Sequence, residues 1–218
     1  MRMRLTRDDA GFTMTEVLIV TLVMGFVSLM LLQTLDSFTR TTARVETRSF
    51  VLNESRFALE TITRDLRAAN PIDAVTPVSL YDNQVSFSVY CTNIGVNGCG
   101  SNNLRPITYR VQNNELQRIV GSEVRRLSGP LGTSSLASAQ RAGAVINTSS
   151  EPVFTYYDRQ GVKLLTSGAS TSPPSHFRDC ARSVQIKLKV RSDAGTGGET
   201  TDLSTRVDLR NYNEVSGC

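Results

Sequence analysis

The residue with the clearest chemical potential is Glu16, a carboxylate inside an otherwise apolar segment. Between Phe12 and Leu35 it is the only charged side chain. A charge at the centre of a membrane costs about 2.5–3.5 kcal/mol unless it is neutralised, so such a residue is a functional candidate. Cleavage of the chain after Gly11 would give Phe12 a free α-amino group. The spacing predicts that Glu16 pairs with the Phe12 amine of an adjacent subunit during assembly.

Residues 11–16, Gly-Phe-Thr-Met-Thr-Glu, lead directly into the apolar run. This arrangement resembles the class III signal of the type IV pilin superfamily, in which a glycine, a phenylalanine, a threonine and a glutamate open an apolar helix. Thr15 departs from the aliphatic residue that is usual at its position. The resemblance implies that prepilin peptidase cleaves between Gly11 and Phe12, that Phe12 is N-methylated, and that residues 1–11 are a leader peptide.

Two other interpretations fit this segment less well. A secretory signal peptide has a basic start, an apolar stretch of about 7–15 residues and a small-residue cleavage site. Here the apolar stretch is longer, and residues 32–36 offer no such site. An ordinary membrane anchor needs about 20 apolar residues, which residues 12–35 supply, but it leaves Gly11 and Glu16 unexplained. An alternative role for Glu16 is that its carboxylate pairs with the Phe12 amine of its own chain or with water.

The charge distribution predicts which side of a membrane the chain occupies. Three arginines precede the apolar run, and basic residues before a spanning helix mark the cytoplasmic side. The bulk of the chain is therefore expected outside the cytoplasm, anchored in the inner membrane by one span. Removal of residues 1–11 takes away three basic and two acidic residues, which lowers the net charge from +4 to +3. So mild a charge does not imply a nucleic-acid partner.

Four cysteines follow the apolar run: Cys91, Cys99, Cys180 and Cys218. An even number in a translocated domain favours disulfides, and four cysteines allow three connectivities. A short turn-rich loop separates the first two cysteines, which predicts a Cys91–Cys99 pair and leaves Cys180 for Cys218. A zinc site is disfavoured, because the chain has no CxxC spacing and a single histidine, His176.

A helical pattern continues beyond Leu35. Apolar residues recur at intervals of seven: Phe38, Val45, Leu52, Leu59 and Leu66. No proline or glycine interrupts residues 26–69, and Asn70-Pro71 predicts the end of the helix. We expect one helix of about 55 residues over 12–69. Phe50 and Phe57 are expected to broaden its apolar stripe under a folded head.

Period-two alternation replaces the helical pattern after Pro71. It predicts strands at residues 85–90, 107–112, 115–120, 153–157, 184–190 and 203–209. Asn113-Asn114 predicts a tight hairpin turn, because asparagine tolerates positive φ. Residues 121–151 are rich in Gly, Ser and Ala and are expected to be irregular, with at most a short strand near Val145.

These elements predict an α+β fold of the type IV pilin-like kind, with one long N-terminal helix packed on a mainly antiparallel β-sheet head. The expected organisation is a leader at 1–11, a transmembrane or filament-core helix at 12–35, an amphipathic second half of the helix at 36–69, and a periplasmic or extracellular head at 70–218. The helix stripe would cover one face of the sheet.

Motifs in the head resemble one branch of the same superfamily. Arg64-Asp-Leu-Arg at the end of the helix, Phe154-Thr-Tyr-Tyr-Asp and Val207-Asp-Leu-Arg-Asn are similar to segments of minor pilins of the PilW and PulJ (GspJ) type. This resemblance implies a minor pilin that helps to initiate a type IV pilus or forms its tip complex. A minor pseudopilin of type II secretion is the alternative, and a tip-located adhesin or DNA-uptake module is a second one.

The resemblance further implies the partners: the inner membrane, prepilin peptidase, and other major and minor pilins in a filament or tip complex at the cell surface or in the periplasm. The sequence offers no nucleophile–base pair, phosphate-binding glycine loop or metal cluster, so no catalytic residue, cofactor or metal is expected. Arg105, Arg118 and the Arg125-Arg126 pair provide scattered basic charge without an aromatic stacking array, so DNA binding is not favoured.

Overall fold

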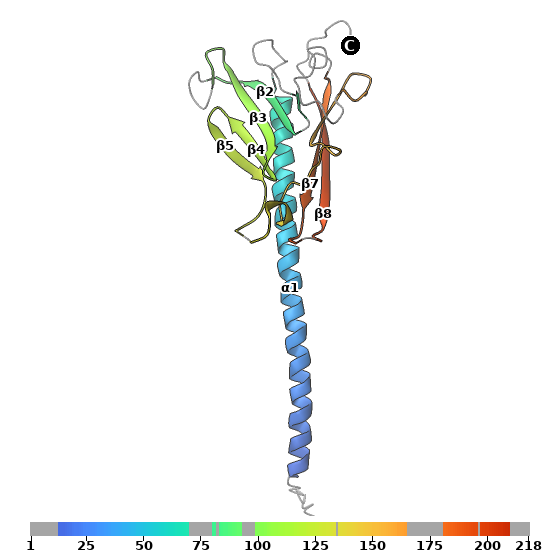
Figure 1. Ribbon diagram of the computed structural model, residues 1–218. Helices are drawn as coiled ribbons and strands as arrows, with labels where there is room; N and C mark the ends of the chain where they lie inside the picture. The colour runs from blue at the N-terminus through green and yellow to red at the C-terminus, as the bar shows by residue number, and fades with distance from the viewer. Residues whose placement is uncertain are drawn as a thin grey trace, which may run out of the picture. The chain divides into compact units, whose positions relative to one another are not determined.

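The computed structural model describes residues 13–69, 80–81, 83–92, 99–133, 135–164, 181–195 and 197–209. The chain divides into two compact units, residues 1–45 and 46–218, and helix α1 (Met14–Arg67) contributes to both. The second unit, called the head below, holds two antiparallel sheets (Figure 1). The predicted α+β class, with a long N-terminal helix and antiparallel strands, is confirmed, although the head has two sheets where one was expected.

Each end of helix α1 lies two residues inside the predicted bounds of 12–69. Its sequence contains no proline, and its one glycine, Gly25, has open space around the position of a side chain. The helix stops at Arg67, and Ala69 already forms a β-bridge with Val89. The proline at position 71 disfavours helical geometry in the residue before it, which explains this end.

The buried face of α1 in the head differs in part from the predicted stripe. The fully buried residues are Val51, Ser55, Ala58 and Ile62, and Leu59 and Leu66 join them. Phe50 and Phe57 are 55% and 54% exposed, so the prediction that the head covers them is wrong. At 3.6 residues per turn, the two phenylalanines lie roughly a third of a turn from Ile62, on the flank of the stripe.

The larger sheet follows the order β1-β2-β3-β4-β5. Its strands are β1 (Leu80–Tyr81), β2 (Gln84–Tyr90), β3 (Leu104–Gln112), β4 (Glu115–Val120) and β5 (Glu123–Ser128). The β3–β4 turn is the predicted asparagine pair, with φ of 53° at Asn113 and 63° at Asn114. Val85, Phe87 and Val89 are buried, as their alternation predicts.

Strand β5 corrects the expectation that residues 121–151 are irregular throughout. A turn at Gly121, whose φ is 59°, returns the chain onto β4. Residues 123–128 do not alternate, because the first four are exposed and the last two are buried. An edge strand with this composition has no period-two signal, so the pattern could not reveal it.

The smaller sheet follows the order β6-β7-β8, with β6 (Phe154–Tyr157), β7 (Ser183–Arg191) and β8 (Thr200–Asp208). Val184, Ile186, Leu188 and Val190 of β7 are all buried, as predicted. Strand β8 begins at Thr200, three residues before the predicted start, and pairs with β7 over nine positions. Residues buried in both sheets and on α1 form one hydrophobic core.

Residues 143–147 connect the two sheets without belonging to a named strand. The Ile146 amide donates to the Lys189 carbonyl, and the Arg191 amide donates to the Ala144 carbonyl. The segment therefore pairs with the part of β7 that lies beyond its pairing with β6. The Asn147 side chain continues this pairing, since its amide donates to the Lys187 carbonyl and its oxygen accepts from the Lys189 amide. On the other sheet, the Val145 amide donates to Asn114 at the β3–β4 turn.

Candidate functional site

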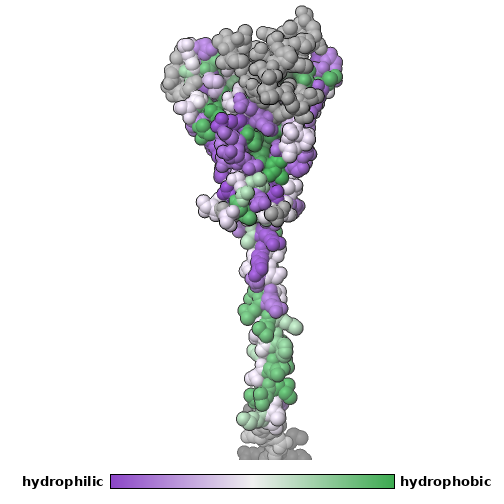
Figure 2. Space-filling model, viewed as in Figure 1, coloured by the Kyte–Doolittle hydropathy of each residue, from purple (hydrophilic) through white to green (hydrophobic). Residues whose placement is uncertain are grey.

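The predicted assembly residue, Glu16, lies exposed in the first turn of α1. Every large apolar side chain from Met14 to Leu35 is at least half exposed. Figure 2 shows this part of α1 as a mainly hydrophobic surface with paler patches, and the helix becomes more polar toward the head. In the described part of the chain, α1 is the one helix long and apolar enough to cross a membrane by length and composition.

The hydroxyl groups within the apolar segment are satisfied by the helix itself. Thr21 donates to the Leu18 carbonyl at 2.9 Å, and Ser28 and Thr34 donate to carbonyls four residues earlier at 2.8 Å. Such bonds remove the cost of placing a hydroxyl in an apolar medium. The Glu16 carboxylate has no hydrogen bond or ion pair within the described residues, so it is the group that still needs a partner.

Four of the predicted site residues lie outside the described residues: Gly11, Phe12, Cys180 and Cys218. Cleavage, methylation, the Glu16–Phe12 pairing and the second disulfide therefore stay predictions. The structure does join Cys91 and Cys99 in a disulfide with a Cα–Cα distance of 6.0 Å, the pair predicted from the short loop.

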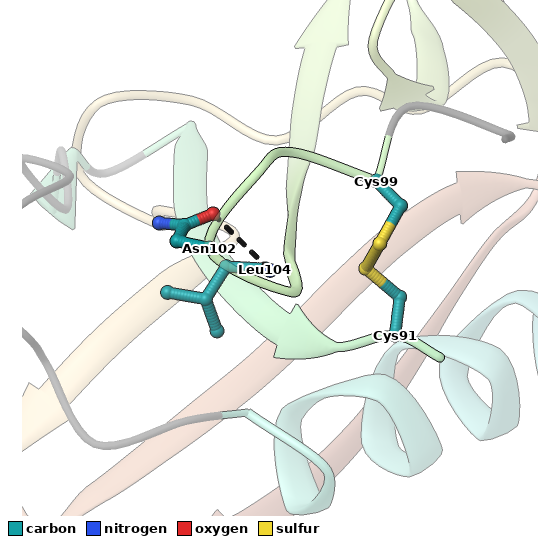
Figure 3. Close-up of a disulfide and its surroundings, with 4 residues drawn as sticks. All are labelled: Cys91, Cys99, Asn102 and Leu104. Carbon is teal, nitrogen blue, oxygen red and sulfur yellow. Dashed lines mark hydrogen bonds between the residues drawn. A yellow bond between two sulfur atoms is a disulfide. The ribbon is translucent and has the colours of Figure 1, made fainter. Parts of the chain in front are cut away.

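The disulfide closes the connection between β2 and β3 (Figure 3). Cys91 follows the last residue of β2 and donates its amide to Asn103 at 2.9 Å. Cys99 is buried, and after it the Asn102 side chain accepts from the Leu104 amide at 3.3 Å. The bond thus holds the start of β3 in register with the end of β2.

Replacing both Cys91 and Cys99 by serine is expected to lower the free energy of unfolding of the head by about 2 kcal/mol, because a closed loop of this size limits the unfolded chain. A urea titration of the full chain in detergent, followed by near-UV circular dichroism, measures the change. Ser101→Ala, in the same connection but exposed, is the matched control. Equal midpoints for the double variant and the control would contradict the expectation.

A buried polar cluster in the head was not predicted. The Tyr109 hydroxyl, on β3, donates to Asp65 Oδ2 at 2.7 Å, and Arg118, on β4, donates to the same oxygen through Nε at 2.9 Å. A second Arg118 nitrogen lies 2.8 Å from that oxygen. Burial and the hydrogen bond to Asp65 raise the pKa of Tyr109, so its phenol stays a donor at neutral pH. The cluster fastens α1 to the middle of the larger sheet.

A second polar contact joins α1 to β5. One Glu54 carboxylate oxygen lies 3.7 Å from an Arg126 nitrogen, and the other oxygen is buried without a hydrogen-bond partner in the described part of the chain. Burial raises the pKa of Glu54, and the Arg126 charge opposes this shift only in part. The ionised form of Glu54 is therefore disfavoured in the folded head.

Glu54→Gln is expected to raise the free energy of unfolding at pH 7. A carboxyl group whose folded pKa is raised contributes its stability below its unfolded pKa, near 4.5, and loses it as the pH rises through the folded pKa. The advantage of glutamine should therefore shrink as the pH is lowered toward 4. Urea titrations at pH 4 to 7 measure this, with the exposed Glu60→Gln as control. A lower stability of Glu54→Gln at pH 7 would show that the attraction of Arg126 outweighs burial.

The described residues hold no group of three or more His, Cys, Asp or Glu side chains placed to bind a metal ion. Two of the arginines considered for DNA binding, the half-buried Arg118 and the exposed Arg126, have partners within the head. Arg118 binds Asp65, and Arg126 binds Glu54 and donates to the Pro130 carbonyl at 3.2 Å. The paired carboxylates offset part of the basic charge of these two side chains.

The chain matches no protein-family model and no curated protein. Among solved structures it is similar to a chain in the crystal structure of the GspK-GspI-GspJ complex from the enterotoxigenic Escherichia coli type 2 secretion system. The two chains are 13% identical, the similarity covers 73% of this chain and 97% of that chain, and the TM-score is 0.39. A similarity this distant carries no argument about function or partners.

Proposed function

We propose that the protein is a minor pilin, a structural subunit that helps to initiate a type IV pilus or forms its tip complex. The observation that carries the proposal is the apolar part of α1, in which Glu16 is the only charge before Asp36 and the large apolar side chains are exposed. A helix of this kind requires an apolar environment, either a bilayer or the packed helices of a filament.

The signal at residues 11–16 supplies the processing step. Prepilin peptidase cleaves between Gly11 and Phe12 on the cytoplasmic side, and Phe12 is then N-methylated. The chain passes from the inner membrane into the filament, with residues 70–218 outside the cytoplasm. The Glu16 carboxylate neutralises the Phe12 amine of a neighbouring subunit, because an opposite charge is the most favourable partner for a carboxylate in a medium of low dielectric constant.

The head contributes a folded domain to such a subunit. Its polar clusters bind helix α1 to the larger sheet. The partners proposed from the sequence resemblance are other pilins. A minor pseudopilin of type II secretion would have the same signal and the same kind of helix, and the subunits that co-purify with the chain distinguish the two.

Intact-mass measurement of the protein from its native host tests the proposal. The expected mature chain begins at Phe12 and carries one added methyl group. A chain that still begins at Met1, or that begins beyond Leu35, would overturn the pilin assignment. Purification of the assembled filament or secretion apparatus, followed by peptide identification, then shows whether the accompanying subunits are pilins or pseudopilins.

A further inference from the structure

Strand β8 forms one edge of the smaller sheet. It pairs with β7 on one side, and no other described strand pairs with it. Figure 1 shows it at the outer side of the head. Its nine residues keep an unbroken register with β7, and they contain no proline, glycine or lysine. Its backbone groups on the open side are thus suited to pairing with a further strand.

Natural proteins usually protect such an edge by shortening it, by adding a bulge, or by placing proline or charged side chains, especially lysine, on it. The opposite sheet edges in this head have these devices. The described part of β1 has two residues, and β5 has six residues, a register shift opposite Leu116/Gln117, and two consecutive arginines. Strand β8 is longer than β1 and β5, has no bulge or proline, and carries charges of both signs, so its edge is suited to a partner strand with the complementary order of charges.

We propose that β8 pairs antiparallel with β8 of a second copy of this chain, about a two-fold axis at Ser204. In this register Asp202 lies opposite the second copy's Arg206, and Arg206 lies opposite the second copy's Asp202. Directly opposed charges of opposite sign stabilise an antiparallel pair, and like charges destabilise it. On the face toward the core, Leu203 lies opposite Thr205 and Thr201 lies opposite Val207.

The neighbouring registers are less favourable. Among these registers, only an axis at Ser204 places each of the two charged residues near the strand centre, Asp202 and Arg206, opposite a residue of the opposite charge. An axis at Asp202 or at Arg206 places that residue opposite its own copy, and an axis at Thr205 opposes Asp202 with Asp208. An axis at Leu203 brings no two residues of opposite charge into direct opposition. A shift that exchanges the two faces of the strand would place the half-buried Leu203 row on the solvent side.

The side chains concerned can reach this partner. The Asp202 side chain is 46% exposed, and one of its oxygens lies 3.1 Å from Lys187. Arg206 donates from Nε to Ser183 at 2.9 Å and stacks at 4.6 Å over the Tyr157 ring. Each residue therefore keeps polar atoms that these contacts do not use.

Antiparallel pairing reverses the direction of the second head. In the view of Figure 1, β8 runs nearly parallel to the part of α1 within the head, so that part of the second helix would run the opposite way. The contact thus joins two heads whose helical parts run in opposite directions. It does not depend on the function proposed above.

A cysteine at the axis tests the register directly. Opposed residues in an antiparallel pair have Cα atoms about 4.5–5.5 Å apart, which a disulfide spans. We expect the full-length Ser204→Cys chain in detergent to form a reducible dimer under mild oxidation. Thr200→Cys is the matched control, because its two copies would lie roughly 27 Å apart. The parent chain sets the background of the native cysteines.

Charge exchange tests the partner residues. In the Ser204→Cys background, Asp202→Arg should abolish the cross-link, and the double change Asp202→Arg with Arg206→Asp should restore it. The double variant also lacks the Lys187 contact, so its recovery separates strand pairing from damage to the head. Sedimentation velocity of the wild-type chain against Asp202→Arg, without any added cysteine, gives the same comparison if the cysteine variant does not fold. A Ser204→Cys dimer no greater than that of Thr200→Cys, together with equal sedimentation of wild type and Asp202→Arg, would overturn the proposal.

Discussion

Asp65→Ala is expected to lower the free energy of unfolding of the head by about 3 kcal/mol. The substitution leaves the Arg118 guanidinium and the Tyr109 hydroxyl without their shared acceptor, and Tyr109 is fully buried. Removing one partner of a buried, hydrogen-bonded ion pair costs about 3–5 kcal/mol, and the partial exposure of Arg118 places this one at the lower end. Urea unfolding of the full chain in detergent measures the change.

The same ion-pair network contains its own control. Arg64 lies 3.8 Å from the other Asp65 oxygen, but its side chain is 76% exposed. Arg64→Ala is therefore expected to cost less than about 0.5 kcal/mol. Asp65→Ala combined with Arg118→Met should recover part of the loss, because both polar partners are then replaced. If Asp65→Ala and Arg64→Ala unfold at the same urea concentration, the buried cluster does not hold the helix to the sheet.

Glu16→Gln is expected to give the largest functional effect, a loss of incorporation into the filament or tip complex with the head still folded. Glutamine keeps the size of the side chain and removes the charge that would neutralise the Phe12 amine. Cleavage after Gly11 and the Cys91–Cys99 disulfide should be unchanged. Co-purification of the variant with its partner subunits, compared with the wild type, measures incorporation.

Asp36→Asn is the matched control for Glu16→Gln. Asp36 is an exposed carboxylate on the same helix, but it already pairs with Arg40 at 2.9 Å. Its replacement should weaken the helix by a few tenths of a kcal/mol and leave assembly intact. Wild-type recovery of Glu16→Gln with the partner subunits would remove the proposed role of this carboxylate. Equal losses in the two variants would point to a general effect of helix charge.

Short-range sequence patterns predict the helix and the β3–β4 hairpin. The continuity of α1 follows from the absence of proline within it, and its C-terminal end follows from the proline at 71. The β3–β4 hairpin follows from Asn113-Asn114. Strand β5 could not be predicted in this way, because its residues are held by pairing with β4 rather than by an apolar face. The spacing of Phe50 and Phe57 predicts that the head covers them, but they lie roughly a third of a turn from Ile62 and are exposed.

The polar cluster of Asp65, Tyr109 and Arg118 could not be predicted from sequence patterns. In the sequence, Asp65 lies between two arginines at the end of an amphipathic helix and resembles an exposed residue. Its partners in the structure are 44 and 53 residues away, so only the pairing of β3 with β4 brings them to it. By contrast, Cys91 and Cys99 are eight residues apart, and their proximity along the chain was enough.

Residues 143–147 have a consequence for the cooperativity of the head. Their amides bond to β7 and to the β3–β4 turn, so neither sheet can open at this point without breaking bonds to the other. Amide hydrogen exchange reports such coupling, because groups that open together share one free energy of opening. Although this segment belongs to neither sheet, the amides of Val145 and Ile146 should exchange as slowly as those of the central strands β3 and β7, and the two sheets should melt as a single unit.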